Sequence, residues 1–490
     1  MKLDLAHVRV CLSGYPPAEW KSLRRTHDLY LRALRSRGFQ VVLENGPTAP
    51  EHSNVDAFLG FWGAAVWQGS FPRSTARIAC LHGGAVVNYR ELGQLLSRLN
   101  EADSIICNCL SDIQVIQSLP LDRLPSLDLL ALPVGTSFQR TSTREGRQAL
   151  GLRMQQPTIG FVGRLVPQKG LHYFIQVLDY CRHRIPGGVS GIVVGDFWPD
   201  YGLLNALGKD YRAYIAGVVS ARDLQQGIRF MLSGMNDEDL RALYSAIDLL
   251  VHPTVSMDEN FGYVPLEALA CGTPVTATAY GGLKDTVARL GGVAAVPTWV
   301  TDEGVRFDLH RLMSNAARCL ADPTTAERLA EEGLELVRDR HSFDSFARRL
   351  QEIIVEAVVR ARTGAHSRGS PVRSVSTVPA LGEGVLDWEA LRPAISHYVS
   401  DSTDSLAEDA SVYLWHGRRD ASAGTYRIED PAWPAVIEVA PSSQDALGKL
   451  PKAGWGLPRL ARPATGDPSL AASLRDLANR GILAWTAADG

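Results

Sequence analysis

Short apolar runs alternate with helical stretches through most of this chain, and the alternation limits the folds open to it. Such a pattern favours a parallel sheet covered by helices on both faces. In residues 1–140 the expected strands are Val8–Leu12, Phe39–Leu43, Val55–Phe61, Ile78–Leu81 and Ser104–Cys107. Helices are expected between or after them, including Asn88–Leu99 and Ser111–Leu119. Residues 1–140 are therefore expected to form a first, Rossmann-like unit.

The alternation then starts again, which predicts a second doubly wound unit over residues 141–340. Its expected strands are Thr158–Val162, Gly191–Val194, Ile228–Leu232, Ile247–His252, Pro274–Ala279 and Val293–Val296. Helices are expected over Leu171–His183 and Asp237–Ala246, the second with Asn236 as its N-cap. Two such α/β units place ligands at the carboxyl ends of their strands and in the crevice between the units.

The rest of the chain divides into three parts. Residues 341–362 are predicted to be an amphipathic helix that crosses back towards the first unit. Residues 363–384 are rich in Ser, Gly, Pro and Arg and are expected to be a linker. Residues 385–490 contain enough apolar side chains to form a small α+β accessory domain, faintly similar to winged-helix modules. Protein contact, self-association and simple packing all remain open as its role.

Composition excludes several classes of protein. The net charge of -3 over 490 residues gives no case for a nucleic-acid binder. No apolar run approaches the roughly 20 residues that cross a bilayer, and the first residues do not resemble a signal peptide. The seven scattered cysteines are expected to be buried free thiols. We therefore expect a protein of the cytoplasm, a reducing compartment.

The most informative segment is residues 258–285, DENFGYVPLEALACGTPVTATAYGGLKD. Gly262 falls where a loop turns into a helix over Tyr263–Ala270, so free backbone amides could bind an anion there. Glu259 lies in the loop and Glu267 within the helix. The two carboxylates are therefore expected to reach different parts of one elongated ligand.

A second segment, GFVGRLVPQKG over residues 160–170, carries two cations on a strand-to-helix loop. Arg164 and Lys169, together with the start of the next helix, suit a diphosphate. The spacing is not that of a P-loop, because Gly170 and Leu171 follow Lys169 in place of Ser or Thr.

Together these two segments resemble the signature of the retaining glycosyltransferases of family 4, which have the GT-B fold. The motifs are GRLxxxKG at residues 163–170 and ExFGxxxLEAxAxGxPV at residues 259–275. The resemblance extends over roughly residues 1–362, including SGYPP, CLHGG, DSIICNCLSD and LPVGTSF in the first half. It implies two Rossmann-like domains facing a cleft, with the acceptor on the first domain and a nucleotide-sugar donor on the second.

The resemblance also implies roles for individual residues. Arg164 and Lys169 would neutralise the diphosphate of the donor and of the leaving group. Glu267 would hold the ribose hydroxyls, and Glu259 the hydroxyls of the donor sugar. His82 would face the donor from the other domain. The remaining donor-binding positions, whose backbone or edges would contact the ligand, are Gly14, Gly163, Met231, Leu232, Asn260, Phe261, Gly262 and Tyr263.

The family's mechanism is front-face substitution, in which the donor phosphate helps to deprotonate the acceptor. No metal site and no cofactor are expected besides the sugar donor, of the UDP or GDP type, and the acceptor could be a small molecule, saccharide, lipid or protein. Two alternatives remain open. One is another GT-B enzyme, a phosphorylase or a nucleotide-sugar epimerase. The other is a non-catalytic sugar-nucleotide-binding protein that acts through its C-terminal domain.

Overall fold

The computed structural model describes residues 5–16, 21–44, 55–61, 71–200, 209–363, 388–406, 410–420, 422–450 and 468–487. The chain divides into two compact units. Unit 1 comprises Met1–Gly135, Met257–Phe261 and Leu336–Gly382. Unit 2 comprises Thr136–Ser256, Gly262–Glu335 and Glu383–Gly490. The predicted linker lies almost wholly outside the described residues, from 364 onward.

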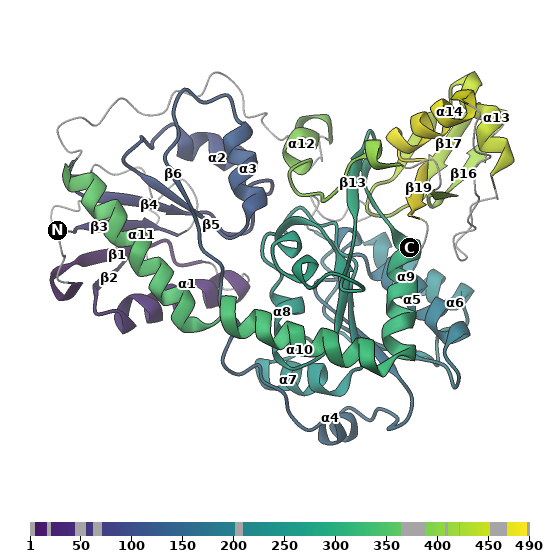
Figure 1. Ribbon diagram of the computed structural model, residues 1–490, viewed down its shortest axis with the longest axis horizontal. Helices are drawn as coiled ribbons and strands as arrows, with labels where there is room; N and C mark the ends of the chain where they lie inside the picture. The colour runs from purple at the N-terminus through teal and green to yellow at the C-terminus, as the bar shows by residue number, and fades with distance from the viewer. Residues whose placement is uncertain are drawn as a thin grey trace. The chain divides into compact units, whose positions relative to one another are not determined.

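Unit 1 is built on a six-stranded parallel sheet of order β2-β1-β3-β4-β5-β6. The strands are β1 (Arg9–Ser13), β2 (Gln40–Glu44), β3 (Ala57–Gly60), β4 (Ala76–Cys80), β5 (Ser104–Cys107) and β6 (Ser126–Leu129). Helices α1 (Lys21–Ser36), α2 (Tyr89–Leu96), α3 (Leu110–Ser118) and α11 (Phe343–Thr363) accompany it (Figure 1). The predicted strands are confirmed. The edge strand β6 was missed because its sequence, SLDL, mixes polar and apolar residues.

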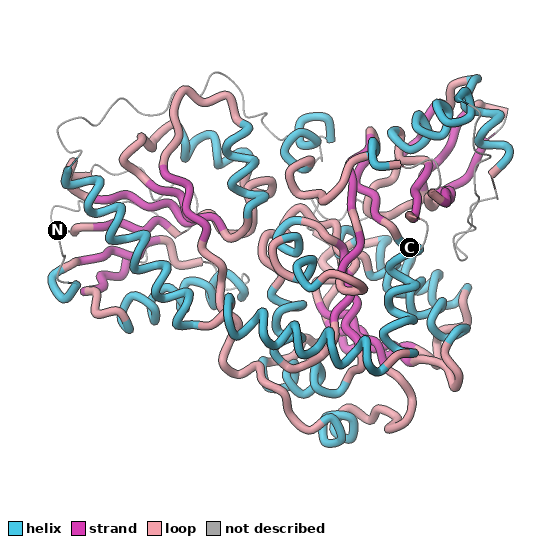
Figure 2. The backbone as a smooth tube through the Cα atoms, viewed as in Figure 1, coloured by secondary structure: helices cyan, strands magenta, loops and turns pink. Residues whose placement is uncertain are grey.

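Unit 2 contains a second six-stranded parallel sheet, of order β12-β11-β10-β7-β8-β9. The strands are β7 (Thr158–Val162), β8 (Ser190–Val194), β9 (Ile228–Met231), β10 (Leu249–His252), β11 (Val275–Thr278) and β12 (Ala295–Val296). All had been predicted. Strands β7, β10 and β11 are buried at every residue, as expected for a parallel sheet covered on both faces. Figure 2 draws the strands of this unit in magenta among its cyan helices.

The helices of unit 2 follow the doubly wound pattern. They are α4 (Thr143–Ala149), α5 (Leu171–Arg184), α6 (Asp210–Ala221), α7 (Asp237–Ala246), α8 (Tyr263–Ala270) and α9 (Leu309–Ala321), followed by α10 (Pro323–Arg340), which belongs to this unit up to Glu335. The side chain of Asn236 accepts hydrogen bonds from the Glu238 and Asp239 amides, so the predicted N-cap of α7 is confirmed. A hairpin of β13 (Thr298–Thr301) and β14 (Gly304–Phe307) extends the unit and was not predicted.

The C-terminal residues of unit 2 form a small α+β assembly. Its elements are α12 (Trp388–Ile395), β15 (Ser411–Leu414), β16 (Gly417–Asp420), β17 (Thr425–Ile428), β18 (Ala435–Glu438), α13 (Pro441–Lys449), α14 (Pro468–Asn479) and β19 (Leu483–Thr486). Strands β15 and β19 pair antiparallel, and β16, β17 and β18 form a second antiparallel sheet. We refer to the described residues from 388 to 487 as the C-terminal extension.

All seven cysteines are buried free thiols, as the sequence indicated. Burial raises the pKa of Cys80, Cys181, Cys271 and Cys319 to about 12, so these thiols stay protonated and act as small apolar side chains. Among the described residues, no helix is both long enough and apolar enough to span a membrane.

Candidate functional site

The strand order of unit 2 contains a switch point between β7 and β10. The chain enters the sheet at β7, adds β8 and β9 on one side, and then returns to add β10, β11 and β12 on the other. In open α/β sheets, ligands bind beyond the carboxyl ends of the strands at such a point. The segments 163–170 and 253–262, which leave β7 and β10, therefore border the expected site.

These two segments contact each other closely. The amide of Val255 donates a hydrogen bond to the Gln168 carbonyl oxygen at 2.9 Å. Gly170 has a φ of 81°, and a Cβ atom there would lie 2.2 Å from the carbonyl oxygen of Pro253. Only glycine can combine this left-handed backbone with so close an approach. The segment after β7 is thus fixed against the segment after β10.

The segment after β7 carries the two predicted cations. Arg164 follows Gly163, and its guanidinium carbon lies 5.4 Å from the centre of the Trp198 ring. Lys169 ends a single 3-10 turn, Pro167–Lys169, immediately before α5. Lys169 is only 8% exposed to solvent, which is uncommon for lysine. Two cations and the positive end of a helix thus share one short segment.

Helix α8 begins where the sequence predicted, at Tyr263, with Gly262 as its N-cap. Gly262 has a φ of 89°, a left-handed backbone that leaves the first amides of the helix without a side-chain cap. Glu267 is buried within α8 and accepts a hydrogen bond from the Tyr244 hydroxyl on α7 at 3.3 Å. This contact fixes the carboxylate of Glu267, and nothing in the local sequence indicated it.

Met231 and Leu232, predicted to lie beside the base, stand at the carboxyl end of β9 and are half-buried. The Met231 carbonyl accepts a hydrogen bond from the Gly195 amide at 3.2 Å, which ties this end of β9 to the end of β8. Both residues therefore lie at the same edge of the sheet as the segments after β7 and β10.

In unit 1, His82 follows β4 and is buried. The centre of its ring lies 4.4 Å from the ring centre of Phe61 and 5.3 Å from that of Tyr30. Burial lowers the pKa of His82 to about 4, so the ring is neutral near pH 7. Its Nδ1 lies 2.7 Å from Asn108 Oδ1, and Asn108 Nδ2 donates to the Leu130 carbonyl. Because Asn108 presents its oxygen, Nδ1 carries the proton and Nε2 is left as an acceptor.

The Nε2 atom of His82 is buried without a hydrogen-bond partner among the described residues. A buried acceptor normally has a partner, because leaving it unsatisfied is costly. Nε2 is therefore suited to accept a hydrogen bond from a hydroxyl group of a ligand. Asn108, which sets this tautomer, was not among the predicted site residues, since the contact spans 26 positions.

Residues Met257–Phe261 belong to unit 1 although they follow a strand of unit 2. Asn260 Nδ2 lies 3.4 Å from Asp112 Oδ2, and the other oxygen of Asp112 accepts from the Ala85 amide at 2.7 Å. The Phe261 ring lies 5.5 Å from the His341 ring. The contacts of Asn260 and Phe261 thus hold the segment that contains Glu259. Glu259 itself is only 6% exposed.

Gly14 follows β1 with a φ of 90°. The strand order of unit 1 has its own switch point, between β1 and β3. Gly14 stands beside it, because the amide of Phe61, after β3, donates to the Ser13 carbonyl at 2.8 Å. This place at the carboxyl end of the sheet is consistent with the predicted close approach of Gly14 to a ligand.

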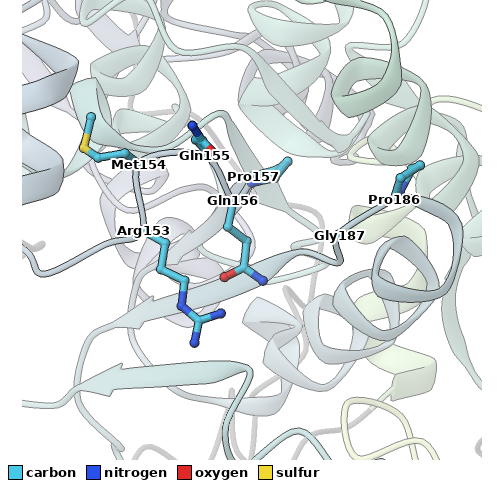
Figure 3. A pocket seen from close by; sticks show the side chains of 7 residues that line it. All are labelled: Arg153, Met154, Gln155, Gln156, Pro157, Pro186 and Gly187. Atoms are coloured by element: carbon cyan, nitrogen blue, oxygen red, sulfur yellow. The ribbon is translucent and has the colours of Figure 1, made fainter.

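A separate surface hollow of about 440 Å³ lies at the opposite edge of the sheet of unit 2. Arg153, Met154, Gln155, Gln156, Pro157, Pro186 and Gly187 line it (Figure 3). Pro157 precedes β7 and Gly187 precedes β8, so the hollow is at the amino ends of these strands. None of the predicted site residues belongs to it. Among the described residues, no group of three or more His, Cys, Asp or Glu could hold a metal ion.

Comparison with known proteins identifies a matching family for part of the chain. Residues 142–333 match the family model described as "Glycosyl transferases group 1", and this segment contains both cations, Gly262 and Glu267. We refer to this matched segment, residues 142–333, as the group 1 domain. In this domain, the segments after β7 and β10 carry the two motifs that the sequence analysis singled out.

Two relatives illustrate the extent of the similarity. The chain is 30% identical over 255 residues to the 2-deoxystreptamine N-acetyl-D-glucosaminyltransferase of Streptomyces fradiae, which covers 51% of this chain and 54% of that protein. It is 32% identical over 165 residues to the D-inositol 3-phosphate glycosyltransferase of Corynebacterium urealyticum, covering 34% of this chain and 36% of that protein. The chain thus matches only about a third to a half of the length of these curated relatives.

Solved structures confirm the GT-B fold. Sucrose-phosphate synthase from Thermosynechococcus elongatus superposes with a TM-score of 0.56 at 20% identity, covering 72% of this chain and 99% of that one. WaaG, a glycosyltransferase involved in lipopolysaccharide biosynthesis, gives a TM-score of 0.51 at 18% identity, covering 71% of this chain and 99% of that one. The group 1 domain of this chain therefore belongs to a protein with two Rossmann-like domains.

Proposed function

We propose that this protein is a retaining glycosyltransferase that moves a sugar from a nucleotide-diphosphate sugar to an acceptor. One observation carries the proposal: Arg164, Lys169 and the start of α8 lie on the two segments that border the switch point of a group 1 glycosyl transferase domain. A diphosphate placed there would meet two cations and two helix N-termini.

The proposal extends to the rest of the donor. Glu267, held by the Tyr244 hydroxyl, is suited to accept hydrogen bonds from the ribose hydroxyls. Met231 and Leu232, at the end of β9, would lie beside the base. Glu259 and the backbone at Asn260, Phe261, Gly262 and Tyr263 would hold the hydroxyls of the donor sugar, and Gly14 would allow a close approach to phosphate.

In the reaction, the bond between the anomeric carbon and the phosphate oxygen breaks, and the nucleoside diphosphate leaves with the electron pair. The acceptor hydroxyl oxygen forms the new bond on the same face, and its proton passes to an oxygen of the departing phosphate. Negative charge grows on the diphosphate in the transition state. Fixed cations at Arg164 and Lys169 therefore accelerate the reaction, because they bind the leaving group more strongly as its charge develops.

His82 would contribute as a neutral acceptor. Its Nε2 atom, unprotonated because Nδ1 donates to Asn108, is suited to bind a hydroxyl group of the donor sugar. A neutral ring avoids placing a further positive charge beside the oxocarbenium-like centre that forms at the anomeric carbon.

The proposal includes a donor of the UDP or GDP type and catalysis without a metal ion, since Arg164 and Lys169 supply the positive charge. The relatives are named for transfer to D-inositol 3-phosphate and to 2-deoxystreptamine, which favours a small polar acceptor. The seven free thiols support the cytoplasm as the compartment. A GT-B phosphorylase or epimerase, and a non-catalytic binding protein, are the competing functions.

The experiment that tests the proposal is donor turnover without metal. The purified full-length protein is incubated in EDTA with a panel of nucleotide sugars, with and without candidate acceptors, and the release of nucleoside diphosphate and the fate of the sugar are followed by mass spectrometry. We expect one donor to be consumed. In Lys169→Met the rate should fall by at least about a hundredfold, a loss typical of removing a charge that stabilises the transition state.

Lys209→Met is the matched control, because Lys209 is an exposed lysine at the start of α6 in the same unit. Its turnover should equal that of the wild type. Conversion of the donor into an epimer, or release of a sugar phosphate in the presence of inorganic phosphate, would replace the transferase by one of the other GT-B enzymes. Tight binding of the donor with no turnover by any acceptor would favour the non-catalytic protein.

A further inference from the structure

The C-terminal extension contacts the group 1 domain through buried polar side chains at its core. Asp430, which follows β17, is fully buried. Its Oδ2 atom accepts hydrogen bonds from the Tyr173 hydroxyl at 2.5 Å and from Trp415 Nε1 at 2.7 Å. Its Oδ1 atom accepts from the Ala432 amide at 2.9 Å and lies 3.4 Å from His172 Nε2. Two of these four groups belong to α5, and two belong to the extension.

These contacts keep Asp430 ionised inside the protein. Burial alone would raise its pKa, but the adjacent His172 ring and the charge of Arg306 hold the pKa well below its usual range. A buried carboxylate is tolerated only while it is hydrogen-bonded and paired. If the extension moved away from α5, the Asp430 carboxylate would therefore lose its partners on α5 or become exposed to solvent.

His172 and Tyr173 connect these contacts to the predicted donor site. Both lie in the first turn of α5, three and four residues after Lys169. The Tyr173 ring also packs against Gly170, since a Cβ atom on Gly170 would lie 2.9 Å from Tyr173 Cδ2. Asp430 thus holds Tyr173, and the Tyr173 ring packs against Gly170 at the end of the segment 163–170.

The extension reaches a second loop at the same edge of the sheet. The Gly281 amide, after β11, donates to the Tyr398 carbonyl at 2.7 Å. Lys284 Nζ lies 2.5 Å from the His397 carbonyl oxygen and 3.0 Å from that of Val399. The backbone of residues 281–284 is therefore held by the extension beside the strand next to β10.

The geometry points to a positioning role: we propose that the C-terminal extension, through Asp430, holds Tyr173 and the start of α5, and so fixes the segment 163–170 that binds the donor diphosphate. This inference rests on the proposed function for the identity of the ligand. Asp430 and Tyr173 act through Lys169 and the helix start and do not touch the substrate. The extension then contributes to the geometry of the donor site without contacting the donor.

Tyr173→Phe tests the proposal, because it removes the hydroxyl that reaches Asp430 and keeps the ring that packs on Gly170. Tyr413→Phe is the matched control. Tyr413 is an equally buried tyrosine of the extension, and its hydroxyl accepts a hydrogen bond from the Leu309 amide at 3.0 Å, at the start of α9. The same hydroxyl donates to the Phe307 carbonyl at 3.4 Å, so the control loses hydrogen bonds between the extension and the start of α9 that involve neither Asp430 nor the Tyr173 hydroxyl.

Two measurements are made on the full-length proteins. Amide hydrogen exchange is followed in a peptide covering residues 163–173 and referred to a peptide covering β8. We expect exchange in 163–173 to become about tenfold faster in Tyr173→Phe and in Asp430→Asn, and to stay unchanged in Tyr413→Phe. Binding of UDP and GDP, measured by calorimetry, should weaken about tenfold in the first two variants only.

Unchanged exchange and unchanged nucleotide affinity in both Tyr173→Phe and Asp430→Asn would overturn the inference, as would equal effects in Tyr413→Phe. A wild-type protein that binds neither nucleotide would instead contradict the proposed function. The exchange measurement separates these failures, because it reports on the order of the segment 163–170 whether or not a nucleotide binds.

Discussion

The close contact between Gly170 and Pro253 allows a sharp prediction. In Gly170→Ala the new methyl group must enter a left-handed backbone and lies 2.2 Å from the Pro253 oxygen, with Tyr173 Cδ2 at 2.9 Å. The backbone term costs about 1 to 2 kcal/mol. The overlap with backbone atoms that cannot rotate away adds about 1 to 3 kcal/mol, as in other overpacked sites. The free energy of unfolding should therefore fall by about 2 to 5 kcal/mol.

Gly187→Ala separates the two terms. Gly187 has the same φ of 81°, but nothing lies within 4 Å of a Cβ atom there. This variant should lose only the backbone term, about 1 to 2 kcal/mol, and should bind nucleotides like the wild type. Urea unfolding gives the stabilities, and calorimetric titration with UDP and GDP gives the affinities.

Relief of the overlap in Gly170→Ala must push the segments after β7 and β10 apart, so nucleotide affinity should fall by at least about tenfold, equivalent to about 1.4 kcal/mol. The reasoning would be refuted if Gly170→Ala matched Gly187→Ala in both stability and affinity. In that case the contact between the two segments would have no part in forming the site.

Three further predictions concern single side chains. Tyr244→Phe removes the hydroxyl that holds Glu267, so nucleotide binding should weaken by about three- to tenfold, the effect of one hydrogen bond to a charged group, with a larger effect on KM than on kcat; an unchanged KM would contradict the role of Glu267. His82→Gln retains a hydrogen-bond acceptor but changes its position, so kcat should fall while nucleotide affinity stays nearly the same. An unchanged kcat would show that His82 has no part in the site. Burial lowers the pKa of His27 and His82 to about 4 and of His416 to about 3, below the unfolded value of about 6.5. The unfolded chain binds more protons between these values, so the free energy of unfolding should fall as pH drops from about 6.5 to 4, and His416→Gln should flatten that slope in urea unfolding at several pH values.

The sequence predicted the fold well where local pattern decides it. The strands of both parallel sheets are short apolar runs bounded by turns, and α8 begins at Tyr263 because Gly262 supplies the left-handed N-cap. The hairpin β13–β14 was missed, since its two strands, TWVT and GVRF, are only four residues each and lie between a buried strand and a helix. Strand β6 was missed for its polar residues at the edge of a sheet.

The site could be predicted only in part. Arg164, Lys169, Gly262 and Glu267 lie within two short motifs, and the spacing within each motif indicates a phosphate or hydroxyl ligand. The partners that hold these groups come from remote positions. Tyr173 and Asp430 are 257 residues apart, so no local pattern could relate them. Residues 385–490 were predicted as a separate accessory domain, and their described part lies in the same compact unit as the group 1 domain.

The most direct test of the account is an experimental structure of the protein with bound UDP or GDP. The account predicts the diphosphate beside the segments after β7 and β10, with Arg164 and the Lys169 ammonium within hydrogen-bond distance of phosphate oxygens and Glu267 on the ribose. A nucleotide bound elsewhere, for example in the hollow lined by Arg153 and Gly187 at the amino ends of the strands, would contradict it.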